Sequence, residues 1–130
     1  MQYGQQDTSF LAAGGEQGLI SLASAFYRQM ETLDEAKKIR AMHPEDLTES
    51  IDKLARFLSG WLGGPKLYRE KYGSISIPRA HQHLAISPTE MDAWLLCMEK
   101  ALESANYPDD FKAYLLKQLA VPASRCVNTE

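Results

Sequence analysis

The residues best suited to bind a metal ion are three histidines, His43, His81 and His83. His81 and His83 lie two positions apart, with no acidic or cysteine residue close by. A zinc site usually needs four protein ligands, or three and a water molecule. In an extended segment these two histidines could both face one ion, but they could equally be solvated loop residues. The sequence therefore contains no complete metal site built from protein ligands alone.

A haem site makes a smaller demand, because the porphyrin supplies four nitrogen ligands and one histidine can complete the proximal side. Such a site needs a helical frame around an apolar slot, a histidine at its wall and polar groups opposite. The chain has these ingredients, but so does a small helical bundle. Most catalytic motifs are absent, including the P-loop, the dinucleotide fingerprint, HExxH, CxxC and the EF-hand loop. Cys97 lies on the apolar side of a predicted helix, which favours a buried thiol over a nucleophile.

The first two of four substantial helices precede the histidine pair. One is predicted from about 18 to 33, where apolar residues recur at spacings of three and four. Asp46 is expected to begin the second, with Glu49 at the capping-box spacing, and the Gly-Gly-Pro sequence at 63–65 to end it. A short helical piece is expected over 66–72. These breaks between periodic segments indicate an all-α chain.

Residues 74–86, which contain the histidine pair, show no periodicity and are expected to be irregular. The third helix then has a strong start, with Ser87 as cap and Glu90 in the capping-box position. Its expected buried face consists of Met91, Trp94, Leu95, Met98, Ala101 and Leu102. A fourth helix follows the NYPDD break, and Pro122 is expected to end or kink it.

Length and charge narrow the function classes. The 130 residues fit a single domain, in which 1–17 is expected to be a partly flexible N-terminal extension because of its glycines. The net charge of −3 and the isoelectric point near 5.6 argue against nucleic acid or an anionic membrane as a partner. There is no apolar run long enough to span a bilayer and no signal-peptide pattern at the start, so a cytoplasmic location is expected.

Several motifs, taken in order, resemble those of the group II truncated haemoglobins, which are two-on-two helical globins. They are FY at 26–27, HPEDLTES from His43, FLSGWLGGPKLY from Phe57, the spacing from Gly73 to His81, and ISPTEMDAWLLCM from Ile86 to Met98. In that family a tryptophan follows the proximal histidine by thirteen positions, the separation between His81 and Trp94. The resemblance covers nearly the whole chain.

This resemblance implies roles for individual residues. His81 would be the proximal iron ligand, and Tyr27 and Trp94 would lie on the distal side. His43 matches a distal position that is usually aromatic. The other residues expected at the haem are Ser50 and Leu54, one turn apart on the second helix, Phe57 in the pocket, and Lys66, Tyr68 and Arg79 as propionate partners. Without the resemblance, Tyr27 and Trp94 would be ordinary core aromatics.

The sequence around the proximal ligand departs from the family pattern. Relatives commonly have arginine, histidine, any residue, proline and phenylalanine, whereas this chain has AHQHL at 80–84. His83 therefore competes with His81 for the proximal role. Only His81 keeps the spacing to both Gly73 and Trp94, and it is the preferred ligand.

The function that the resemblance implies is reversible binding of O2 and other small diatomic ligands, NO and CO, by haem b in a two-on-two globin fold. A second hypothesis is a haem-based redox enzyme that detoxifies NO or peroxide with a partner reductase. A third is a haem-free helical interaction domain. A haem absorption band in the purified protein would exclude the third hypothesis, and turnover with a reductant would separate the first two.

Overall fold

The computed structural model describes residues 3–74 and 76–129, except for the side chain of residue 80. Positions 1, 2, 75 and 130 lie outside the described residues. The first two belong to the expected N-terminal extension and position 75 to the expected irregular segment, and all four belong to the expected single domain. The helices are α1 (Thr8–Ala12), α2 (Gly15–Thr32), the 3-10 helix η1 (Asp34–Ala36), α3 (Lys37–Ala41), α4 (Thr48–Trp61), α5 (Leu67–Tyr72), α6 (Ile77–His81), α7 (Pro88–Ser104) and α8 (Asp109–Cys126). No strand occurs within the described ranges. The all-α prediction is confirmed.

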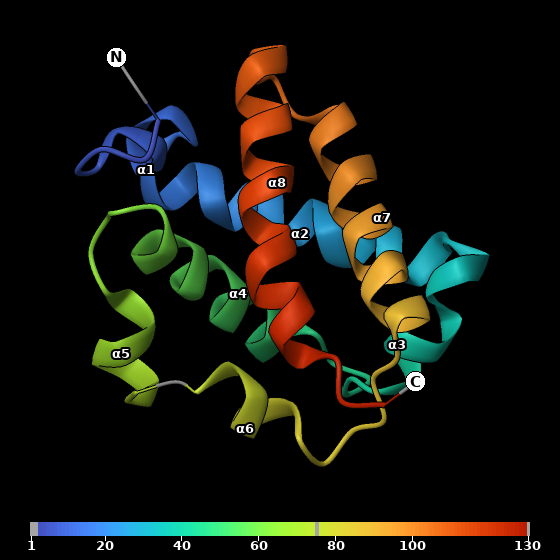
Figure 1. The fold of residues 1–130 in the computed structure, drawn as a ribbon. Helices are drawn as coiled ribbons and strands as arrows, with labels where there is room; N and C mark the ends of the chain where they lie inside the picture. The colour runs from blue at the N-terminus through green and yellow to red at the C-terminus, as the bar shows by residue number, and fades with distance from the viewer. Residues whose placement is uncertain (1–2, 75, 130) are drawn as a thin grey trace.

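Four long helices form the frame of the molecule. Helix α2 packs against α4, α7 packs against α8, and α2 also contacts α7, which it crosses from behind in Figure 1. Phe26, Leu58, Met98 and Phe111, one from each long helix, are fully buried between them. Helix α6 lies outside this frame, at the lower edge of the view in Figure 1, and contacts α8. This arrangement is the expected two-on-two sandwich.

Helix α2 begins earlier than the predicted start at about residue 18, despite the glycines in this region. The helix begins at Gly15, and Gly18 lies within its first turns. A Cβ atom on Gly18 would lie only 1.9 Å from the carbonyl oxygen of Ala13, so the absence of a side chain allows a close backbone approach. The same Ala13 carbonyl accepts a hydrogen bond from the Tyr107 hydroxyl at 2.7 Å. Glycine is needed at position 18 for close backbone packing. The low helix propensity of glycine had instead suggested that the helix begins only at this residue.

The expected capping box at the start of α4 is not formed. The helix begins at Thr48, and the carboxylate of Asp46 accepts hydrogen bonds from the Thr48 N–H and hydroxyl at 3.0 and 2.7 Å. Glu49 instead pairs with Lys53 at 3.2 Å. Asp46 thus satisfies the N–H of the first residue of α4, but Glu49 makes no reciprocal bond back to it. The end of α4 is as predicted, with Gly63 in a left-handed conformation just after it.

The expectation of an irregular segment over 74–86 is wrong in part, because the five residues of α6 lie inside it. Pro78 in its first turn has a backbone angle already suited to a helix. Five residues are too few to show a helical period in the sequence. The predicted capping box of α7 is confirmed, since the Ser87 hydroxyl accepts from the Thr89 N–H at 3.2 Å and Glu90 accepts from the Ser87 N–H at 2.9 Å.

The buried face predicted for α7 needs correction, and so does one of the two outcomes expected at Pro122, the end of the helix. The buried face of α7 includes Ala93 and Cys97, and Met91, Trp94 and Leu95 are only half-buried. Pro122 does not end α8, which continues to Cys126. Proline removes one backbone donor from a helix, and near the end of a long, well-packed helix that loss does not interrupt it. Trp94, being half-buried, is therefore not completely enclosed by the core.

No helix among the described residues combines the length and apolar character needed to cross a membrane.

Candidate functional site

His81 is the last residue of α6 and is half-buried. Its Nδ1 atom lies 2.8 Å from the carbonyl oxygen of Ile77, one turn earlier in the same helix. A carbonyl oxygen can only accept, so Nδ1 carries the hydrogen and Nε2 keeps a free lone pair. A backbone carbonyl that orients a ligand histidine in this way is common at metal sites. The imidazole is therefore held in the tautomer that can bind a metal through Nε2.

His43 has the same local arrangement just after α3, with Nδ1 2.8 Å from the carbonyl oxygen of Ile39. Burial lowers the pKa of His43, the hydrogen bond to Ile39 opposes this shift, and the positive charge of Arg40 adds to it. His83, by contrast, is exposed. Of the two candidates for the proximal role, His81 is the one that combines partial burial with a ring oriented by a hydrogen bond.

Aromatic rings connect His43 to Trp94 through the interior. The Tyr27 ring lies 5.4 Å from the His43 ring and 4.9 Å from Phe26, which lies 4.8 Å from Trp94, all between centroids. Tyr27 is 7% exposed, and burial raises its pKa, so its hydroxyl stays protonated. Among the described residues, nothing forms a hydrogen bond with this hydroxyl or with the indole N–H of Trp94, and neither atom is completely buried. Two donors therefore remain available to a ligand.

The expected residues of α4 lie along one side of that helix. Leu54, Phe57 and Trp61 are half-buried against the core, and the rings of Phe57 and Trp61 stack at 5.6 Å. Ser50 is half-buried one turn before Leu54. A cleft of about 640 Å³, which we call the α4–α6 cleft, opens beside this row. It is lined by Phe57 and Trp61 from α4, Lys66, Tyr68 and Arg69 near α5, Ile77 and Pro78 from α6, and Arg125 from α8.

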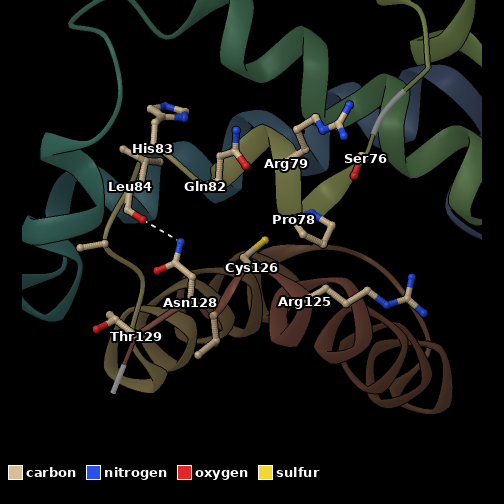
Figure 2. Close-up of a pocket in the computed structure, with 12 residues that line it drawn as sticks. Ser76, Pro78, Arg79, Gln82, His83, Leu84, Arg125, Cys126, Asn128 and Thr129 are labelled. Atoms are coloured by element: carbon tan, nitrogen blue, oxygen red, sulfur yellow. Dashed lines mark hydrogen bonds between the residues drawn. The ribbon is translucent and has the colours of Figure 1, made fainter.

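Arg79 does not line the α4–α6 cleft. It borders a second cavity of about 780 Å³ between α6 and the end of α8, which we call the tail cavity, together with His83 and Asn128 (Figure 2). Of the three expected propionate partners, Lys66 and Tyr68 face the first space and Arg79 the second. Basic side chains thus flank α6 on both sides.

Helix α5, which forms one wall of the cleft, is tied to α4 by Asp52. The carboxylate of Asp52 accepts hydrogen bonds from Arg56 on its own helix at 2.9 Å, and from Lys71 and Tyr72 on α5 at 2.8 and 2.6 Å. The bonds from Lys71, Tyr72 and Arg56 hold the pKa of Asp52 well below its usual range. This network fixes the position of Tyr68 in the same short helix.

The residues present fit a haem better than a bare metal ion. Among the described residues, no group of three or more histidine, cysteine, aspartate or glutamate side chains could hold a metal. A porphyrin needs only one histidine from the protein, and His81 offers an oriented Nε2. In the α4–α6 cleft, the rings of Phe57 and Trp61 suit a flat apolar ligand and Lys66 suits a carboxylate, although His81 itself does not line this cleft.

Several residues of this region were not predicted as site residues from the sequence. Trp61 could have been, because it continues the apolar face of the second predicted helix. Phe26 could also have been, because it lies beside Tyr27 in the FY motif. Ile77 and Arg125 carry no local signal, since their roles depend on how α6 meets α8.

Comparisons with known proteins agree with this geometry. The model of the bacterial-like globin family matches residues 8–126. The chain is 33% identical over 125 residues to group 2 truncated hemoglobin YjbI of Bacillus subtilis, covering 96% of this chain and 92% of that protein. The solved group II 2-on-2 hemoglobin of Agrobacterium tumefaciens is similar with a TM-score of 0.88 and 34% identity, covering 99% and 100% of the two chains. A solved truncated haemoglobin of Bacillus subtilis is similar with a TM-score of 0.82 and 32% identity, covering 92% and 98%.

Proposed function

Since the chain belongs to the bacterial-like globin family, as a group II truncated haemoglobin, we propose that it binds haem b through His81. We propose further that it binds O2 and the related ligands NO and CO reversibly. Membership of the family itself implies haem-based binding of small gas ligands. The choice of ligand, of proximal residue and of distal donors goes beyond that membership and depends on the site.

The orientation of His81 carries the proposal. Its Nδ1–H is donated to the Ile77 carbonyl at 2.8 Å, which leaves Nε2 as the coordinating atom. This bond also makes the imidazole a stronger ligand, because an acceptor at Nδ1 increases the electron density of the ring. His83 is exposed and has no such bond in the described part of the chain. We therefore assign the proximal role to His81.

Haem supplies the iron at which a diatomic ligand binds. The protein's part is to supply donors to that ligand and to exclude water. O2 held in such a pocket carries partial negative charge and accepts hydrogen bonds, for which Tyr27 and Trp94 have free donors. Leu54 offers no hydrogen bond at its position, and Ser50 has a short reach. The similar Bacillus subtilis haemoglobin is described as oxygen-avid, which supports O2 as the ligand.

Haem content of purified variants tests the assignment. We expect the parent protein to bind haem with a Soret band that shifts when CO is added to the ferrous form. His81→Gly should lose most of its haem, or hold it weakly, and added imidazole should restore a parent-like spectrum. His83→Gly is the matched control and should behave as the parent. Haem loss in His83→Gly but not in His81→Gly would contradict the assignment, and a parent without a Soret band would contradict the function.

A further inference from the structure

Asn128, in the tail that follows α8, makes an unusual set of hydrogen bonds to the segment after His81. Its backbone N–H donates to the Ile86 carbonyl at 2.8 Å, and its Oδ1 accepts from the Ile86 N–H at 2.9 Å. Its Nδ2 donates to the carbonyl of Leu84 at 2.7 Å and to that of His81 at 3.4 Å. Figure 2 shows the bond to Leu84. One residue thus holds both ends of the link between α6 and α7.

The orientation of the Asn128 amide follows from its partners. The Ile86 N–H can only donate, so the atom facing it must be the oxygen. The Leu84 carbonyl can only accept, so the atom facing it must be the nitrogen. Neither aspartate nor leucine could make both bonds at this position. The site is matched to an amide.

Helix α6 needs outside support, because an isolated helix of five residues is unstable in water. Its last carbonyl groups have no partners within the helix. The carbonyl of His81 is one of them, and it accepts from the Leu84 N–H at 3.0 Å and from Asn128. Asn128 therefore closes the end of the helix that carries the candidate iron ligand.

Packing alone does not hold this segment. The tail cavity, of about 780 Å³, separates residues 82–85 from the end of α8, and Asn128 borders it (Figure 2). Gln82 and His83 in that segment are exposed. Because side chains do not fill the space between residues 82–85 and the end of α8, the hydrogen bonds at the edge of the cavity must fix the distance between these two segments.

The position of α6 in turn controls the imidazole. The His81 ring is oriented by the Ile77 carbonyl, four residues earlier, and that bond exists only while α6 keeps its helical turn. We propose that Asn128 is a positioning residue for His81, holding α6 and with it the imidazole in place at the haem. This inference rests on the proposed haem ligation by His81.

Two substitutions distinguish the bond that Asn128 accepts from Ile86 from the bonds that it donates to Leu84 and His81. Asn128→Asp keeps an oxygen for the Ile86 N–H but removes the donors to Leu84 and His81. Asn128→Ala removes all the side-chain bonds. Thr129→Ala is the matched control in the same tail, because the bond from Thr129 to the Ile86 carbonyl at 3.2 Å comes from its backbone N–H. Circular dichroism should confirm that each haem-loaded variant is folded.

Two measurements on the haem-loaded proteins test the proposal. The first is the iron–histidine stretching band in resonance Raman spectra of the ferrous protein, which reports on the proximal bond and not on overall stability. The second is hydrogen exchange of the Ile86 amide by NMR. We expect Asn128→Ala to shift or broaden the band and to speed exchange at Ile86 roughly fivefold, the value of one net hydrogen bond. Asn128→Asp should change the band but keep Ile86 protected, and Thr129→Ala should change neither.

The outcomes are distinguishable. A band with the parent's position and width in both Asn128 variants would overturn the inference, even if exchange at Ile86 increased, because the tail would then dock without positioning His81. If Asn128→Ala does not fold, Asn128→Asp decides the matter alone. A parent protein that has no iron–histidine band would overturn haem ligation by His81 and the inference with it.

Discussion

Replacing Trp94 by phenylalanine removes an indole N–H and leaves the aromatic packing largely intact. The Trp94 ring contacts Phe26 at 4.8 Å, and a phenylalanine ring can keep a contact of this kind. The lost donor has no partner among the described residues, so its removal leaves no buried protein acceptor unsatisfied. The substitution therefore tests the hydrogen bond to the ligand with little effect on the fold.

A hydrogen bond to a charged acceptor contributes about 1.5–3 kcal/mol, and about 1.4 kcal/mol corresponds to a tenfold change in an equilibrium. Trp94 is half-buried, so the lower end of this range applies. We expect Trp94→Phe to speed O2 release about tenfold. Tyr27→Phe should have a smaller effect in the same direction, since a hydroxyl can rotate and accept as well as donate, whereas an indole N–H can only donate.

Stopped-flow dissociation of O2 from the ferrous protein measures both effects. CO is a poorer hydrogen-bond acceptor, so its release should change less and serves as the control for general damage to the pocket. Because burial raises the pKa of Tyr27, its hydroxyl remains a donor, and the Tyr27→Phe effect should be the same at neutral and mildly alkaline pH. O2 release within twofold of the parent in both variants would refute the assignment of Tyr27 and Trp94 as the donors.

Two further predictions concern the scaffold. Asp52→Asn loses its ion pairs with two partly exposed basic side chains and should lower the free energy of unfolding by roughly 1–2 kcal/mol at pH 7, measured by urea unfolding. Because the pKa of Asp52 is lowered in the folded state, this contribution is present above the ordinary aspartate pKa of about 3.9 and lost as pH falls through the folded value. A difference that persists unchanged at pH 2 would contradict an origin in the charge of Asp52. Gly60→Ala should raise the thermal midpoint of unfolding, because its Cβ would meet only ordinary contacts at 3.8 Å and alanine in a helix is favoured over glycine by about 0.5–1 kcal/mol. Gly18→Ala should lower the midpoint, because its Cβ would lie 1.9 Å from the Ala13 carbonyl oxygen. Equal midpoints for the two variants would contradict the packing role of Gly18.

The long helices were predictable from the sequence because each has a strong repeating signal. The third predicted helix has both an apolar period and a capping box at Ser87, and the structure confirms it. Helix α6 was not predictable, since its five residues are shorter than the pattern that would reveal a helix. The bonds of Asn128 to His81 and to Ile86 join residues more than forty positions apart, and sequence periodicity carries no information about such contacts.

The candidate site was predictable to a different degree for each residue. His81 emerged from its spacing to Trp94 within a family resemblance, and that resemblance is confirmed. The hydrogen bond from His81 to Ile77, which fixes the tautomer, could not be predicted, because it depends on the helical turn of α6. The resemblance implies Arg79 and Lys66 together as propionate partners, but only the fold shows that they face different cavities.

The central claim is that Nε2 of His81 is the proximal ligand of a haem. Resonance Raman spectra of the ferrous parent, His81→Gly and His83→Ala proteins test it most directly. We expect the iron–histidine stretching band in the parent and in His83→Ala, and its loss in His81→Gly. When ¹⁵N-labelled imidazole is added to His81→Gly, a band with an isotope shift should appear. A band that persists in His81→Gly without imidazole, or disappears in His83→Ala, would contradict the claim.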